Sequence, residues 1–416
     1  MIQDEVNVMK KEMQDVLENN ILRFWLDKMV DTENRGFYGQ MTGTGHLMKD
    51  ADKGGILSAR ILWAFSAAYR VLRKPEYLMA ATRMKDYILE HFYDKQYGGT
   101  YWSVDFLGRP NDTKKQFYAI GFMIYGLSEY VRATGDNEAL QYAIRLFECI
   151  ETHSLDRVHN GYIEACTRNW GVIEDMRLSE LDANYPKSQN THLHIIEPYT
   201  NLFRVWKDPS LEKALRNLIH IFTDKILNPE TFHLDLFFEN DWTRGAGHLE
   251  SYGHDIECAW LLHEAALVLG DDEVLAKVEP IVIRVAKASE KGLNPDGSMI
   301  HEANLDTGHV DDDLHWWVQA ETVVGFADIY QYFGDAEAWQ KALRCWQYIK
   351  NQLIDWQNGE WYWSRHRDGT LNTRDDKAGF WKCPYHNSRM CLELIERNFT
   401  AVLSTTTAIS PQNLNN

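Results

Sequence analysis

The chain has 416 residues, of which 44% are hydrophobic and 25% are charged, a balance typical of a soluble globular protein. Its 61 acidic and 43 basic side chains give a formal charge of -18, and no basic run interrupts the acidic background. That field repels nucleic acid and anionic membranes, so we expect neither as a partner. We find no signal-peptide pattern and no membrane span, and the six cysteines are scattered without CxxC pairing. These features predict a cytoplasmic protein with free thiols.

The predicted elements begin with an amphipathic N-terminal helix, in which Val6, Met9, Met13, Val16 and Leu17 recur at helical spacing. Six later stretches share one pattern, since each predicts an amphipathic helix of roughly four to five turns. They are residues 55–69, 117–130, 190–206, 253–269, 316–333 and 384–395. Each starts roughly 60 to 75 residues after the last, which indicates an internal repeat.

A second set of helices is predicted between most members of the first. Examples are residues 77–91, 138–151, 211–226 and 336–352. Gly135, Gly270 and Gly334 each follow a predicted helix and fit its C-terminal cap. Short alternating runs at residues 99–104, 297–301 and 359–363 predict small β-hairpins.

This repeat predicts the fold class. About twelve helices in six antiparallel pairs bury their apolar faces best in a closed ring, with one helix of each pair inside. We therefore expect an all-α (α/α)6 barrel with short β-hairpins in the loops at one mouth. A single catalytic domain is expected over residues 1–400, and the polar tail 401–416 is expected to be loose.

The repeat also predicts where the functional site lies. Near the start of each helix of the first set, a polar or aromatic residue stands where core packing favours an apolar one. These residues are Arg60, Tyr118, Asn190 with His194, His254, Trp317 and His386. Equivalent ends of the inner helices meet at one mouth of such a barrel, so we expect these side chains to share one pocket.

His254 and Glu257 lie three residues apart at the start of a strongly apolar helix, so the two side chains share one face and can touch. A carboxylate in contact raises the pKa of an imidazole. His386 has no acid three or four residues ahead, only Arg389 and Met390. We therefore expect a protonated His254 and a neutral His386. Histidine titrates near neutral pH and suits general acid–base chemistry.

Four segments in this order resemble the N-acylglucosamine 2-epimerase superfamily. They are residues 190–197 (NTHLHIIE), 253–257 (GHDIE) and 316–321 (WWVQAE), and Trp381 with Pro384-Tyr385-His386. Within the superfamily the chain is most similar to members that act on β-1,4-linked disaccharides. The match is weaker around residues 177–188. The resemblance implies the same barrel and reversible epimerisation at C2 of the reducing-end glucose, converting cellobiose to glucosyl-mannose and lactose to epilactose.

The resemblance also implies the site residues. His254 and His386 are the expected acid–base pair, and His194 is a third essential histidine. Arg60, Glu257 and Glu321 are the other expected catalytic residues, and the substrate-binding set is Tyr118, Asn190, Trp260, Trp317 and Trp381. The partner is a small β-1,4 disaccharide, and we expect a monomer or weak homodimer.

The chemistry opens the sugar ring, removes the C2 proton and returns a proton to the other face. Arg60 is the natural donor to the charge on O1 of the enediolate. No redox cofactor and no metal is required, and the sequence has no Gly-rich nucleotide loop. From glucose to mannose we expect His386 to act as the base and His254 as the acid. Transfer on one face or on two remains open at this stage.

Other functions fit parts of the same pattern. The nearest are an N-acylglucosamine 2-epimerase proper and an aldose–ketose isomerase. An inverting glycoside hydrolase needs two facing carboxylates, whereas the expected pocket residues are mainly imidazole, Arg and Trp. A non-catalytic sugar-binding barrel would tolerate loss of either acid–base histidine.

Two further motifs have ordinary structural explanations. His192 and His194 face apart on a helix, which argues against a metal site made from this pair. Residues 311–313 are three consecutive aspartates that lack the rest of an ion-binding pattern, so we expect a solvated turn.

Overall fold

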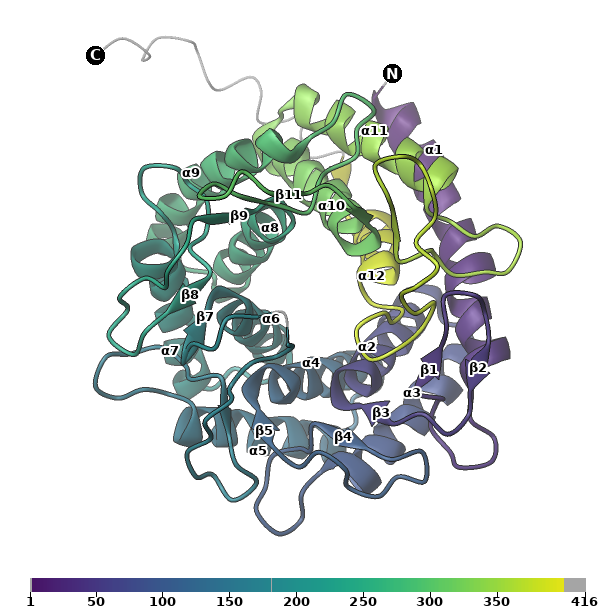
Figure 1. Ribbon diagram of the computed structural model, residues 1–416, viewed down its shortest axis with the longest axis vertical. Helices are drawn as coiled ribbons and strands as arrows, with labels where there is room; N and C mark the ends of the chain where they lie inside the picture. The colour runs from purple at the N-terminus through teal and green to yellow at the C-terminus, as the bar shows by residue number, and fades with distance from the viewer. Residues whose placement is uncertain (1, 181, 400–416) are drawn as a thin grey trace.

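A computed structural model describes residues 2–180 and 182–399, and these residues form two concentric rings of helices (Figure 1). The inner ring contains α2 (Gly55–Leu72), α4 (Phe117–Thr134), α6 (Gln189–Val205), α8 (Tyr252–Leu269), α10 (Trp316–Phe333) and α12 (His386–Glu396). The outer ring contains α1 (Ile2–Asp15), α3 (Pro75–Tyr87), α5 (Asn137–His153), α7 (Pro209–Ile221), α9 (Asp272–Ser289) and α11 (Ala336–Gln352). The predicted (α/α)6 barrel is confirmed.

The ring closes through the last inner helix. Each inner helix packs against the next, and α12 contacts both α10 and α2. The N-terminal helix α1 packs against α12 and supplies its outer partner. Closure removes the exposed apolar face that an open array of helix pairs would leave.

The helix boundaries follow the sequence signals closely. The helix predicted at residues 316–333 has those bounds, and the other inner helices differ by only a few residues at their ends. Gly135, Gly270 and Gly334 cap α4, α8 and α10 with φ of 78°, 74° and 73°. A left-handed backbone costs glycine little, which explains why it recurs at these three ends. The predicted tail 401–416 lies outside the described residues.

Short strands join neighbouring repeats at one mouth. The strand before each of five inner helices pairs antiparallel with the strand that follows the next outer helix. The pairs are β3 (Lys53–Gly54) with β4 (Ser103–Val104), β5 (Lys115–Gln116) with β6 (Ala165–Cys166), β7 (Lys187–Ser188) with β8 (Phe237–Phe238), β9 (Leu249–Ser251) with β10 (Glu302–Asn304), and β12 (Leu314–His315) with β13 (Ser364–Arg365). β11 (Val310–Asp311) extends the β9–β10 sheet, and β1 (Gln40–Met41) pairs with β2 (Leu47–Met48). The predicted hairpins are present as bridges between Tyr93 and Thr100, Leu293 and Met299, and Ile354 and Trp361.

Buried ion pairs repeat with the strands. In each of the first three repeats a short strand precedes the inner helix, and the first residue of that strand is a lysine. This lysine forms an ion pair with an aspartate that lies in a turn earlier in the chain. The pairs are Lys53–Asp31 at 2.8 Å, Lys115–Asp94 at 2.9 Å and Lys187–Asp156 at 2.8 Å. Asn228 and Asn294 occupy the aspartate's place in the next two repeats, where Glu250 and Leu314 replace the lysine. Neutralising the acid where its cation is missing avoids an uncompensated buried charge.

Charged side chains line the opposite end of the barrel, around a cavity of about 380 Å³. Arg70 of α2 pairs with Glu129 of α4 at 2.6 Å, and Arg204 of α6 pairs with Glu264 of α8 at 2.6 Å. Across the described residues no helix combines the length and the apolar character needed to cross a membrane.

Candidate active site

A cavity of about 280 Å³ opens where the inner helices begin, and every inner helix contributes to its wall. Nine of the predicted site residues line it: Arg60, Tyr118, Asn190, His194, His254, Glu257, Trp317, Trp381 and His386. They come from segments spread over more than three hundred residues, as the closed ring requires. The expected convergence on one pocket is therefore observed.

His386 begins α12 and is held by a carboxylate from the neighbouring inner helix. Its Nδ1 lies 2.6 Å from Oε1 of Glu321 on α10. Burial lowers the pKa of His386 to about 3 although Glu321 acts in the opposite direction. The neutral His386 that the sequence predicted is consistent with this shift, and no acid of its own helix contacts it. The partner lies on another helix, so local spacing could not reveal it.

His254, in the first turn of α8, contacts Oγ of Ser251 through Nδ1 at 2.8 Å rather than Glu257. Burial, together with the nearby His301 and His194, lowers its pKa to about 3. The predicted protonated His254 is therefore wrong. Glu257 instead accepts a hydrogen bond from Nη2 of Arg389 on α12 at 2.7 Å, because that guanidinium outcompetes a neutral imidazole for the carboxylate.

Arg389 connects three carboxylates beneath the cavity. Its Nη2 donates to Glu257 and to Glu321, each at 2.7 Å, and its Nη1 donates to Glu197 of α6. Burial would raise the pKa of Glu321, but Arg389 and His386 lower it to about 2. Burial and the charge of Glu321 raise the pKa of Glu257 well above its usual range. The cluster therefore keeps Glu321 ionised and favours a proton on Glu257.

His194 is positioned by a break in α6. Its φ and ψ of -91° and 16° are not helical, and Pro198, four residues later, cannot donate to its carbonyl. The carbonyl instead approaches α4 at Gly121, where a Cβ atom would lie 2.3 Å from the oxygen. Nδ1 of His194 lies 2.9 Å from Oε2 of Glu197. Burial, with Arg60 and Arg389 nearby, lowers the pKa of His194 well below its usual value.

Arg60 is clamped between two aromatic rings. Its guanidinium carbon lies 4.2 Å from the ring centroid of Phe122 and 4.6 Å from that of Tyr385. Its Nη2 donates to the hydroxyl of Tyr118 at 3.0 Å. Stacking fixes the plane of the guanidinium and leaves it able to donate to a ligand oxygen in the cavity.

Aromatic rings form the remaining wall. Trp317 lies beside both acid–base candidates, with ring centroids 4.9 Å from His254 and 5.7 Å from His386. Trp381 contacts Tyr118 with a centroid separation of 6.1 Å. Flat amphipathic rings of this kind pack well against sugar rings.

Two predicted residues lie behind the wall instead of in it. Trp260 is fully buried, and its Nε1 donates to Oε2 of Glu321 at 2.9 Å. Glu321 is buried as well and contacts the cavity residue His386. The structure therefore places Trp260 behind Glu321 and out of reach of a ligand in the cavity.

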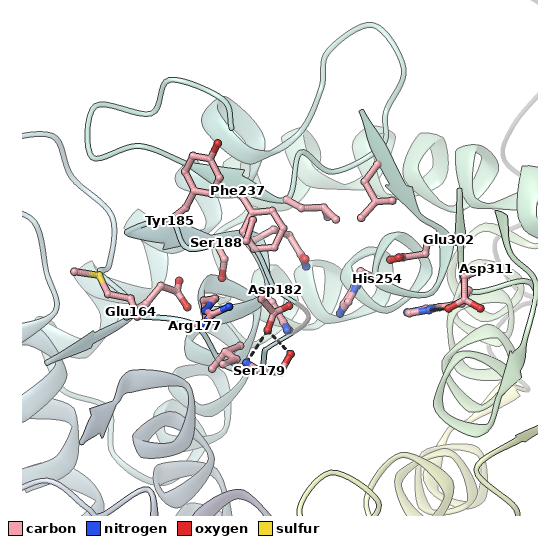
Figure 2. Close-up of a pocket in the computed structure, with 18 of the residues that line it drawn as sticks. Glu164, Arg177, Ser179, Asp182, Tyr185, Ser188, Phe237, His254, Glu302 and Asp311 are labelled. Carbon is pink, nitrogen blue, oxygen red and sulfur yellow. Dashed lines mark hydrogen bonds and ion pairs between the residues drawn. The ribbon is translucent and has the colours of Figure 1, made fainter. Parts of the chain in front are cut away.

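A second cavity of about 330 Å³ adjoins the first and shares His254, Asn190 and Asp182 with it (Figure 2). Residues 176–179, 182, 183 and 185, which belong to one loop, contribute to its lining, and the ring of Phe237 stacks on that of Tyr185 with a centroid separation of 5.9 Å. Within this loop Asp182 accepts hydrogen bonds from the backbone and the hydroxyl of Ser179, each at 2.9 Å. This is the segment in which the family resemblance is weakest.

Several cavity residues were not predicted. They are Leu178, Ser179, Asp182, His301, His315, Trp316 and Trp363, with Arg389 beneath them. Trp316 and Trp363 belong to aromatic runs that the sequence displays, His301 immediately precedes β10, and His315 ends β12. The loop residues lie outside the repeated helices, so the internal repeat could not predict them.

Two further motifs of the sequence are the histidines of residues 192 and 194 and the aspartates of residues 311–313. His192 is buried, and its Nε2 accepts from the backbone N–H of Tyr162 at 2.9 Å, so it is structural and faces away from His194, as predicted. The expected solvated turn at residues 311–313 is wrong, because each aspartate has a basic partner. Asp311 contacts His301, Asp312 pairs with Arg367, and Asp313 contacts His366.

The sequence profile of the N-acylglucosamine 2-epimerase (GlcNAc 2-epimerase) family matches residues 36–389. The chain belongs to the N-acylglucosamine 2-epimerase family. Cellobiose 2-epimerase of Bacteroides fragilis is 60% identical over 388 residues, which cover 93% of this chain and 99% of that protein. Cellobiose 2-epimerase of Ruminococcus albus is 40% identical over 94% of this chain and 99% of its own.

Solved structures of similar proteins have the same fold. The structure of cellobiose 2-epimerase from Bacillus thermoamylovorans superposes with a TM-score of 0.90 at 43% identity, over 94% of this chain and 100% of that one. A D-mannose isomerase structure, at 21% identity and a TM-score of 0.80, shares the fold. The helical ring is thus common to relatives of different names, so the cavity residues must carry the specificity.

Proposed function

We propose that this protein catalyses the reversible epimerisation at C2 of the reducing-end glucose of β-1,4-linked disaccharides such as cellobiose and lactose. One observation carries the proposal: His254 and His386 begin two different inner helices, line one cavity and both lie beside Trp317. The 60% identity to a cellobiose 2-epimerase over nearly the whole chain supports the choice of substrate.

The cavity suits an open-chain aldose that develops negative charge. Removal of the C2 proton moves the electron pair of the C2–H bond into a C1–C2 double bond and places the charge on O1. Arg60, held in its plane by Phe122 and Tyr385, is the proposed donor to that oxygen. The beginnings of the inner helices also face the cavity, and their dipoles favour an anion there.

His386 is the proposed base in the direction from glucose to mannose. Its Nδ1 donates to Glu321, so Nε2 carries the lone pair that accepts the C2 proton. Glu321 stabilises the imidazolium that forms, and Arg389 and Trp260 hold Glu321 in place. The sequence argument for His386 as the base rested on the lack of an acid three or four residues ahead, and the carboxylate of Glu321, from another helix, adds a second reason.

Since both rings start neutral, the proton that reaches the other face of C2 has two sources. It is either the proton that His386 has just taken, returned after rotation about C2–C3, or one that His254 has acquired from a sugar hydroxyl or from water. Conversion in D2O tests the first route. Protium at C2 of single-turnover product shows return of the same proton, because a proton delivered by His254 comes from groups that have exchanged with D2O.

The arrangement of the carboxylates does not support an inverting glycoside hydrolase. The three carboxylates beside the histidines, Glu197, Glu257 and Glu321, are gathered on Arg389. An inverting hydrolase needs two carboxyl groups that face each other across the scissile bond with room for a water.

The test incubates the purified protein separately with cellobiose, lactose, mannose and N-acetylglucosamine, and follows the anomeric NMR signals. We expect glucosyl-mannose from cellobiose and epilactose from lactose. His386→Ala and His254→Ala should each lose activity by about 100-fold or more, while His220→Ala, a change at an exposed histidine of α7, should not. Free glucose as the main product, or full turnover by His386→Ala, contradicts the proposal.

A further inference from the structure

A cluster of two imidazoles and one carboxylate lies at the rim of the catalytic cavity. Nδ1 of His301 lies 2.8 Å from Oδ2 of Asp311, and Nε2 of His315 lies 3.7 Å from the same oxygen. The two imidazole rings are 4.7 Å apart. All three side chains are partly exposed, and both histidines line the cavity.

The backbone holds these three residues in place. Glu302, next to His301, pairs with Asp311 across β10 and β11, and the N–H of His301 donates to the Asp311 carbonyl at 3.2 Å. The carbonyl of His301 accepts from the N–H of Tyr252, where α8 begins. His315 ends β12 and immediately precedes α10. The three donors are therefore fixed by strands tied to two inner helices, a rigid arrangement of the kind that favours metal binding.

The donor set and its spacing suit a divalent transition metal. Zinc binds imidazole nitrogen and carboxylate oxygen at about 2.0–2.2 Å, which places neighbouring donors of a tetrahedral site about 3.4 Å apart. The separations of 2.8 Å and 3.7 Å bracket that value, so a small rotation of the side chains would complete the site.

We propose that His301, Asp311 and His315 form a binding site for a divalent transition metal ion such as Zn²⁺, and that its occupation inhibits turnover. The inhibitory part rests on the proposed function, whereas the binding part does not. His301, Asp311 and His315 line a cavity that His254 also lines, so a bound ion would occupy space in that cavity and hold a positive charge near the ring that must exchange protons.

Two other groups near the cavity are poorer candidates. Glu257, Glu321 and His386 also lie close together, but Nη2 of Arg389 already donates to both carboxylates. Asp313 contacts one imidazole, that of His366, so this pair supplies two donors, whereas a stable zinc site has about four ligands. The pair of Asp313 and His366 therefore provides a matched control.

The experiment titrates the metal-free full-length protein with ZnCl2 by calorimetry in a non-coordinating buffer. We expect one ion per chain for the wild type and for Asp313→Asn. Asp311→Asn and His315→Gln should each weaken binding by at least about 10-fold. Circular dichroism and thermal unfolding verify that each variant is folded. Failure of the wild type to bind Zn²⁺, or equal affinity in Asp311→Asn, overturns the site.

A second arm measures epimerisation of cellobiose with increasing ZnCl2 and then with excess EDTA. Inhibition of the wild type that EDTA reverses, and that Asp311→Asn lacks, is the expected result. Binding without inhibition overturns the link to turnover. If no turnover occurs even without metal, the proposed function fails, while the calorimetric result still decides the metal site.

Discussion

Oε1 of Glu321 on α10 accepts hydrogen bonds from Nδ1 of His386 at 2.6 Å and from Arg389 at 2.7 Å. Because this carboxylate is ionised and can only accept, the imidazole proton must reside on Nδ1. That tautomer leaves Nε2 free to take a proton in the cavity. The relationship between Glu321 and His386 therefore fixes both the orientation and the basicity of the proposed base.

Replacing Glu321 by Gln should lower kcat for cellobiose by about 100-fold or more, with a smaller change in KM. The amide keeps the shape of the side chain but cannot stabilise the imidazolium by charge. Steady-state kinetics on cellobiose measures both parameters. Glu264→Gln, which alters an acid paired with Arg204 at the far end of the barrel, is the control. A kcat close to that of the wild type would remove Glu321 from the mechanism.

Arg389→Met should destabilise the fold by about 3–5 kcal/mol, because three buried carboxyl groups lose their shared cation. Urea unfolding monitored by tryptophan fluorescence gives the free energy of unfolding. Arg367→Met is the matched control, since Arg367 is exposed and pairs only at the surface with Asp312. If the two variants unfold at the same urea concentration, Arg389 does not hold the cluster together.

The pH dependence of kcat/KM should differ from that of an ordinary histidine. Activity requires a neutral base, and the pKa of His386 is lowered to about 3, so the rate is lost only as pH falls toward that value. We expect kcat/KM to stay level from about pH 7 down to about pH 5, through the usual histidine pKa of about 6.5. A loss of activity centred near the usual histidine pKa would show that the burial shift is wrong.

Glu257→Gln should leave the acidic limb of that profile unmoved. Glu257 contacts Arg389 rather than His254, and its raised pKa already favours the protonated carboxyl that Gln imitates. The comparison uses the same pH series for the variant and the wild type. A shift of the limb would mean that Glu257 tunes one of the imidazoles after all.

Asp156→Asn should lower stability more at neutral pH than in acid. Burial acts to raise the pKa of Asp156, yet Lys187 and backbone N–H groups lower it from 3.8 to about 2. A carboxylate with a lowered pKa stabilises the fold above its unfolded pKa, and that contribution is lost as pH falls toward and through the folded value. Urea unfolding at about pH 7 and about pH 2.5 compares variant and wild type, and the difference between them should be smaller at the lower pH. A difference between variant and wild type that persists unchanged in acid contradicts this account.

Much of the site was predictable because the repeat marks equivalent positions. Arg60, Tyr118 and Trp317 occupy polar or aromatic positions near the starts of inner helices, and the ring brings such starts together. The loop residues Ser179 and Asp182 carry no such mark, because loops follow neither helical nor strand periodicity. Their contribution to the cavity appears only once the chain is folded.

Periodicity along the chain was enough to predict the ring of paired helices, its glycine caps and most of the side chains at one mouth. Which acid contacts which base depends instead on how the helices pack. Glu257 lies three residues from His254 yet contacts Arg389, and His386 takes its carboxylate from Glu321 on another helix. Spacing along a helix shows which side chains can touch. In a buried site, however, a carboxylate pairs with a charged guanidinium in preference to a neutral imidazole.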